Sequence, residues 1–278
     1  MLNKVLIAAQ KLSKFLVPLA ALAIIAGFLN IAPEGILGKA DAIGYAVCHR
    51  LDPRSFHVDG RQLPLCARCS GMYLGAVLGF IFLNLRYHHS AGIPPKPVLF
   101  IFALFVLGFA VDGSNSYLYL MKSVYGGRLS FIPNLYVPNN TLRLFTGSGT
   151  GLGMAAAVFF SLNQTMWKDW DNKPILGRPR DFFILIALML LVDVLVLPEW
   201  GWILYPAAIL SAGGVLVLLS SVYGILWAML MRQENLYMHY GQAWLPLMAG
   251  LTIALLQITL FDIVRLWITH TWGGFPLG

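Results

Sequence analysis

The segment from Cys48 to Gly71, CHRLDPRSFHVDGRQLPLCARCSG, holds all three cysteines of the 278-residue chain, with two of its six histidines and four arginines. Its last cysteines are spaced C-x-x-C, which lets two thiolates in one turn point at a single metal ion. The adjacent pair Cys48-His49 supplies a third sulfur and a nitrogen. Three sulfurs and one imidazole are an ordinary tetrahedral zinc set, so the pattern predicts a zinc site formed by Cys48, His49, Cys66 and Cys69.

Other interpretations of the same residues stay open. Adjacency makes it sterically demanding for Cys48 and His49 to bind one ion, and His57 is an alternative fourth ligand. In an oxidising compartment Cys66 and Cys69 could instead form a disulfide, and the site would then hold no cofactor. No histidine follows Cys69 directly, so the c-type haem attachment pattern is absent.

The rest of the chain is strongly apolar, with 58% hydrophobic and 11% charged residues and a mean hydropathy of +0.73. Such a composition excludes an ordinary soluble domain and predicts a multi-pass membrane protein. The apolar runs are too continuous for the alternation of a β-barrel, so we expect an all-α transmembrane bundle. About seven spans are expected, at Phe15–Ile31, Met72–Leu85, Val98–Leu120, Leu144–Phe160, Phe182–Leu197, Ile203–Met231 and Trp244–Ile268.

Lysine distribution orients this bundle. With a cytoplasmic N-terminus, only Lys39 and Lys122 fall outside, whereas the inner side receives Lys4, Lys11, Lys14, Lys96, Lys168 and Lys173. The cysteine segment then lies on the non-cytoplasmic face of the cell membrane. A reversed topology, in which the arginines of that segment mark the cytoplasm, is the alternative. The net charge of +7 suits anionic membrane lipids and requires no nucleic acid.

Further polar residues are expected on the same face. Asp112 lies far along the third span, and Asn140 and Arg143 lie just before the fourth. Asp112 could act as a catalytic base or orient His49, and His49 could be a general base if it is not a ligand. Four residues are predicted to bind an anionic ligand or cofactor, namely Arg54, Arg68, Asn140 and Arg143.

Two features of the later chain and the spans are structural predictions. Asp262 and Arg265 stand three residues apart and would meet on one helix face. Glycines recur every fourth residue in the second and fourth spans, which permits close helix packing there, at Gly71, Gly75, Gly79, Gly147 and Gly151.

These motifs resemble a family of bacterial and archaeal membrane proteins known as domain of unknown function 2085. The resemblance rests on a Cys-His pair, an Arg-Ser pair, Cys-x-Arg-Cys followed by glycine and an aromatic residue, an Asp-Gly, and Asn-x-x-Arg-x-x-x-Gly. In this chain they are Cys48, His49, Arg54, Ser55, Cys66, Arg68, Cys69, Gly71, Tyr73, Asp112, Gly113, Asn140, Arg143 and Gly147. The resemblance implies a shared site but no established activity. It predicts a family-like core over residues 1–165, with the outer Cys/His loop at 32–70, and a three-span extension over 166–278 packed in the same bundle.

Three functions fit these predictions. The first is a zinc-binding membrane enzyme acting on anionic lipid head groups. The second is a scaffold or accessory subunit of a larger membrane complex, in which a closed metal site only stabilises the loop. The third is a thiol-disulfide or quinone oxidoreductase using the cysteines. Membrane lipids and other membrane subunits are the expected partners.

Overall fold

The computed structural model describes residues 2–125 and 131–274, and it is an all-α membrane bundle with little sheet. Its helices are α1 (Leu2–Ile31), α2 (Gly35–Val47), α3 (Ala67–Tyr87), α4 (Lys96–Tyr125), α5 (Asn140–Met166), α6 (Pro179–Val196), α7 (Gly201–Leu230) and α8 (Trp244–Thr269). Short elements join them, namely the 3-10 turn η1 (Asp52–Arg54) and the strands β1 (His57–Val58), β2 (Arg61–Gln62), β3 (Ser90–Gly92) and β4 (Asp171–Pro174). β1 and β2 form an antiparallel hairpin, and β3 pairs with β4 in parallel.

Six of these helices are long and apolar enough to cross a membrane, namely α1, α3, α4, α5, α7 and α8. The remaining predicted span, Phe182–Leu197, does form a helix, α6. It has only 18 residues, and three of them are charged. Two of those charges are buried against polar partners. Asp181 accepts hydrogen bonds from Arg86 and Tyr87, and Asp193 accepts one from Ser148.

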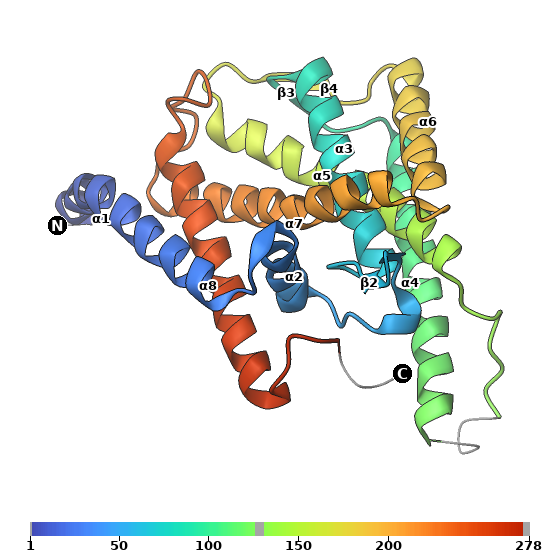
Figure 1. Cartoon of the computed structure of the whole chain (residues 1–278). Helices are drawn as coiled ribbons and strands as arrows, with labels where there is room; N and C mark the ends of the chain where they lie inside the picture. The colour runs from blue at the N-terminus through green and yellow to red at the C-terminus, as the bar shows by residue number, and fades with distance from the viewer. Residues whose placement is uncertain (1, 126–130, 275–278) are drawn as a thin grey trace.

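The bundle has two ends that differ in chemistry. Gln10 donates to the carbonyl of Met231, which places the first part of α1 beside the end of α7. The β3/β4 pair joins Ser90 to Asp171, which places the connection between α3 and α4 beside the connection between α5 and α6. The lysines predicted to be on the inner side belong to these segments, so we term this end of the bundle the lysine end. At the other end Tyr45 hydrogen-bonds Thr269, bringing the cysteine loop to the end of α8. We term this the cysteine end. The two kinds of loop therefore lie at opposite ends of the bundle (Figure 1).

The core is centred on the pairing of α3 with α5, which pack along their glycine faces. A methyl group added at Gly147 would lie 2.2 Å from the Arg68 carbonyl oxygen, and one at Gly71 would lie 2.3 Å from that of Leu144. Only glycine permits backbones to approach this closely. The predicted glycine faces are confirmed, and they fix the first turn of α3 against the first turns of α5.

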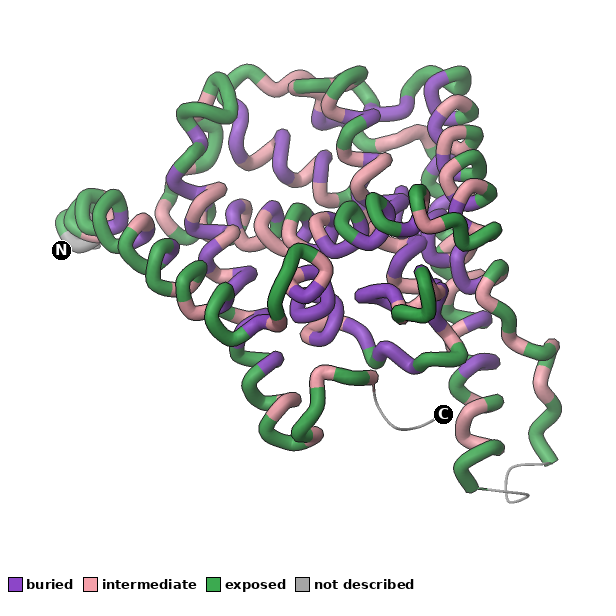
Figure 2. Tube along the Cα trace, viewed as in Figure 1, coloured by how far each residue is buried: buried purple, intermediate pink, exposed green. Residues whose placement is uncertain are grey.

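Burial is strongest around this pair and weakest on α1 and α4 (Figure 2). α1 extends from the rest of the bundle and contacts it mainly through α8 (Figure 1). α4 packs on α5 and exposes much of its remaining apolar surface, including Leu107 and Tyr117. Such surface suits contact with lipid.

The predicted loop 32–70 contains regular secondary structure. It contains α2, whose buried face includes Asp41, Gly44 and Tyr45. A methyl group on Gly44 would lie 1.9 Å from the Pro64 carbonyl oxygen, so this helix packs directly on the chain that leads into α3. Because α2 also contacts α7 and α8, the residues after 200 support the cysteine loop.

Candidate metal centre

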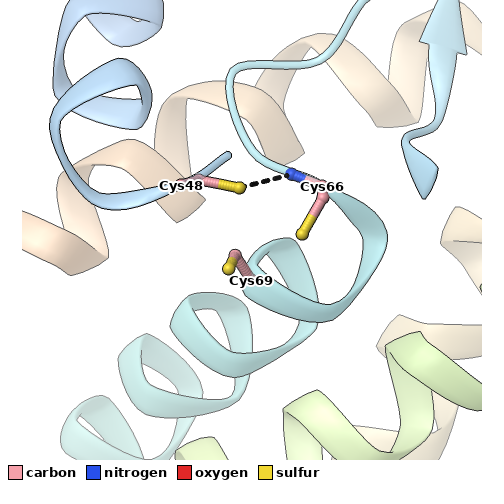
Figure 3. Close-up of side chains that lie close together, drawn as sticks. All are labelled: Cys48, Cys66 and Cys69. Carbon is pink, nitrogen blue, oxygen red and sulfur yellow. Dashed lines mark hydrogen bonds between the residues drawn. The ribbon is translucent and has the colours of Figure 1, made fainter. Parts of the chain in front are cut away.

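The three cysteines converge at the junction of two helices. Cys48 is the residue that follows α2, Cys66 immediately precedes α3, and Cys69 lies in the first turn of α3. Their sulfur atoms all lie within 4.8 Å of one another and form no disulfide (Figure 3). Zinc–sulfur bonds of about 2.3 Å in a tetrahedron place sulfurs roughly 3.8 Å apart, so a small contraction would suit one ion.

Backbone groups hold Cys48 in this position. Its Sγ accepts hydrogen bonds from the N–H of Cys66, at 3.3 Å, and from the N–H of Arg50, at 3.4 Å. Arg50 itself has a left-handed backbone, with φ of 52°. Hydrogen bonds of this kind stabilise a negatively charged sulfur.

The thiols of this cluster do not ionise independently. The pKa of Cys48 is raised to about 12, first because its thiol hydrogen-bonds Cys66 and then because it is buried. The pKa of Cys66 is lowered well below its ordinary value because the side chains of Cys48 and Cys69 hydrogen-bond its sulfur. The charge of Arg68 contributes in the same direction. These opposite directions favour ionisation of Cys66 over that of Cys48.

The two predicted histidines occupy different places. Among the described residues, the metal-binding group of side chains consists of the three cysteines alone. His49 is exposed and lines the cavity beside them. The ring of His57 lies 2.9 Å from Asp52 Oδ1, and its backbone N–H donates to Glu199. His57 is thus engaged elsewhere, on the β1/β2 hairpin.

A cavity of about 340 Å³ adjoins the sulfurs. All three cysteines and His49 line it, together with four arginines: Arg50, Arg54, Arg68 and Arg143. Its opposite wall comes from α4 and is apolar, formed by Phe109, Tyr117, Leu120 and Met121. A ligand entering this cavity would meet sulfur and guanidinium groups on one side and hydrocarbon on the other.

Asp112 orients one of these arginines and does not contact the sulfurs. It is 1% exposed and accepts two hydrogen bonds from Arg68 and one of 2.7 Å from the Tyr136 hydroxyl. Arg68 also stacks over the Phe109 ring, with its central carbon 5.4 Å from the ring centroid. These contacts support a role for Asp112 in positioning Arg68. The roles of Asp112 as a catalytic base and as a partner of His49 stay predictions.

The Asn-x-x-Arg motif forms a second such pair. Asn140 Oδ1 accepts a 2.7 Å hydrogen bond from Arg143, and its amide donates to the Ser55 carbonyl. Arg54 donates to the Ser116 carbonyl at 2.8 Å. The structure therefore brings together every predicted anion-binding residue, with Asn140 behind Arg143 and the three arginines facing the cavity.

Two important residues could not be identified from sequence patterns. Arg265, expected to be a structural partner of Asp262, donates to the carbonyls of Cys48 and His49 at 2.6 and 3.2 Å and lies over the Tyr45 ring. Tyr136 lies in the segment before α5, where Asn115 holds it by accepting from Leu135 and donating to Tyr136. Neither residue has a diagnostic spacing to the cysteines, because both contacts are long-range.

Comparison with known proteins identifies the same segment. The family described as predicted membrane protein (DUF2085) matches residues 48–157, a range that contains every residue lining the cavity. An uncharacterized protein of Methanothermobacter thermautotrophicus is 31% identical over 110 residues, covering 39% of this chain and 81% of that protein. Uncharacterized protein MJ1492 of Methanocaldococcus jannaschii is 32% identical over 83 residues, covering 30% of this chain and 51% of its own length.

No solved structure matches the chain. The family core thus begins at Cys48 itself and ends within α5, whereas Arg265 lies outside it. The division into residues 1–165 and 166–278 stays a prediction, although α7 packs against α3 and α5, and α8 packs against α1 and α2. On the match to its archaeal relative and the family's own pattern, the chain belongs to the DUF2085 family of predicted membrane proteins.

Proposed function

We propose that the protein binds one zinc ion through Cys48, Cys66 and Cys69 at the non-cytoplasmic face of the cell membrane, with the fourth coordination position open to the cavity. The convergence of the three sulfurs within 4.8 Å on the cavity wall carries this proposal. Soft thiolate ligands favour zinc over magnesium or calcium, which prefer oxygen. Three protein ligands and one exchangeable position are the arrangement of catalytic zinc sites.

The surrounding charges suit an ion held by thiolates. Three thiolates and Zn²⁺ together carry one negative charge, which weakens the Lewis acidity of the ion. Arg54, Arg68 and Arg143 line the same cavity and would offset that charge. We therefore propose that the centre acts on anionic lipid head groups, with the metal polarising an oxygen of the head group or activating a water molecule.

A second candidate is a structural metal in a scaffold or accessory subunit of a membrane complex. The burial of Cys48 and the two backbone hydrogen bonds to its sulfur favour it, because these features are typical of closed structural sites. In that case His49, which is exposed and lines the cavity, would rotate to fill the fourth position.

Metal analysis of the purified full-length chain tests the proposal. We expect about one zinc per chain in the wild type and its loss in Cys66→Ser and Cys69→Ser, with Lys173→Ala, at the lysine end, retaining it. Equal metal content in all four proteins would disprove the site. Thiol counting on the same samples distinguishes the oxidoreductase alternative, since a disulfide would remove two reactive thiols without any metal.

Cobalt substitution then separates the two metal functions. Co²⁺ bound by three sulfurs and an exchangeable water changes its visible spectrum when an added anion replaces the water. An open site predicts such a change in both the wild type and His49→Ala. A closed site predicts no response in the wild type and a response only after His49 is removed.

A further inference from the structure

The strongest unassigned feature of the cavity is an excess of positive charge. Three guanidinium groups line it, from Arg54, Arg68 and Arg143, and one carboxylate, Asp112, pairs with Arg68. The fourth arginine of the lining, Arg50, pairs with Asp41 at 3.0 Å, and Asp41 also pairs with Arg61. The three arginines and Asp112 together carry two positive charges. Zinc held by three thiolates would add one net negative charge and would leave one positive charge uncompensated. Buried charges are costly unless they are paired, so this excess indicates a missing anion.

The excess belongs to Arg143 and Arg54. Within residues 2–125 and 131–274, neither side chain takes part in an ion pair. Arg143 is only 5% exposed, yet its Nε is buried with no hydrogen-bond partner. Arg54 donates one hydrogen bond, to the Ser116 carbonyl. Both guanidinium groups line the cavity and therefore retain donors for a ligand.

The opposite wall indicates what accompanies the anion. Tyr117, Leu120 and Met121 lie on the last turns of α4, one of the least buried helices, and Tyr117 is 61% exposed. A ligand carrying hydrocarbon could enter along this face with its charged group directed at the arginines. A volume of about 340 Å³ accommodates a head group and leaves no room for acyl chains.

We infer that Arg54 and Arg143 form a binding site for the phosphate group of a ligand, beside the cysteine cluster. This inference rests on the proposed function for its location, since the phosphate would lie next to the metal's open position. Guanidinium groups bind phosphate through paired N–H donors, which explains why the site uses arginine rather than lysine. Both a lipid head group and free phosphate have this chemistry.

Calorimetric titration of the full-length protein in a nonionic detergent tests the site. The probes are inorganic phosphate and short-chain phosphatidic acid, with short-chain diacylglycerol as the uncharged control. We expect phosphatidic acid to bind, diacylglycerol not to bind, and Arg54→Gln and Arg143→Gln each to weaken binding about tenfold or more. Arg86→Gln is the matched control, because Arg86 pairs with Asp181 at the lysine end.

The comparison of probes identifies the source of the phosphate. Tighter binding of phosphatidic acid than of inorganic phosphate indicates a lipid ligand, and equal binding indicates free phosphate. If neither probe binds, or if both arginine variants bind with unchanged affinity, the inference is overturned. Should Arg143→Gln elute as aggregate, the half-buried Arg54→Gln carries the test alone.

Zinc content measured on the same samples separates this inference from the proposed function. Phosphate binding that depends on Arg54 and Arg143 in a protein without zinc would refute the metal site and leave the phosphate site standing. If the wild type and the variants retain zinc but bind no phosphate probe, the metal site stands and the phosphate site is refuted.

Discussion

The backbone N–H of Cys66 donates a hydrogen bond to the sulfur of Cys48 across 3.3 Å, joining the start of one helix to the end of another. The 17 residues between them include a 3-10 turn and a small hairpin, so this contact closes a compact unit. A metal ion bound to both sulfurs would reinforce the same closure.

Chelation should therefore destabilise the protein. If zinc is held at about 100 times its Kd, its removal costs about 2.7 kcal/mol, because only the folded state binds the ion. We expect a lower Tm after chelation and recovery on adding zinc. Cys66→Ser should show the lower Tm from the outset and no response to the chelator, and a response like that of the wild type would contradict a cysteine-bound ion.

The ion pair between Arg68 and Asp112 should contribute much more to the free energy of unfolding than a surface ion pair does. Asp112→Asn leaves a largely buried guanidinium without its countercharge, which costs about 3 kcal/mol or more. Asp171→Asn is the control, since its pair with Lys173 is largely exposed and contributes roughly 0–1 kcal/mol. Thermal unfolding in detergent measures both. Similar Tm changes in the two variants would show that Asp112 is not holding a buried charge.

Arg265 should support metal binding without being a ligand. Its guanidinium holds the carbonyls of Cys48 and His49, and loss of such outer contacts typically lowers metal affinity about 10–100-fold. We expect Arg265→Ala to weaken zinc binding by this factor in a competition titration. Arg232→Ala, an exposed change at the lysine end, should leave affinity unchanged. A wild-type affinity in Arg265→Ala would exclude this role.

The contact between α3 and α5 should tolerate no side chain. Gly147→Ala places a methyl group against the Arg68 carbonyl and should cost about 1–3 kcal/mol by forcing the helices apart. Gly213→Ala, where no atom lies within 4 Å of the added methyl, should be neutral or stabilising by up to about 1 kcal/mol. The two variants have the same chemical change, so equal Tm values would refute the packing explanation.

The orientation predicted from lysines can be measured with introduced cysteines. The side chains of Asp52 and Lys173 are 75% and 79% exposed and lie at opposite ends of the bundle. A membrane-impermeant maleimide applied to intact cells should label Asp52→Cys above the wild-type background and label Lys173→Cys only after permeabilisation. The opposite pattern would place the cysteine end in the cytoplasm.

Much of the fold follows from apolar runs, because a membrane leaves helices as the practical way to satisfy the backbone. The predicted spans underestimate helix lengths where polar turns are covered by protein. α3 begins at Ala67 rather than Met72, since its first turn packs on α5. The sequence does not predict α2, because its 13 residues are too few to span a membrane and mix apolar residues with Gly, Lys and Asp.

The candidate site was only partly predictable. Clustering of residue types identified the cysteines and Arg68, which are close in sequence. The choice of Asp112 followed from the cost of a carboxylate at membrane depth. Tyr136 and Arg265 reach the site through tertiary packing alone, and a single sequence contains no local signal for such contacts.

The contact between Arg265 and Cys48 spans 217 residues, nearly the whole chain. During synthesis the cysteine segment emerges and its neighbouring helices insert well before α8 exists. The loop therefore passes an interval in which its contact with Arg265 is missing. Maturation of the centre is in this way tied to the completion of the polypeptide, and a truncated product would carry the ligands without the residue that secures them.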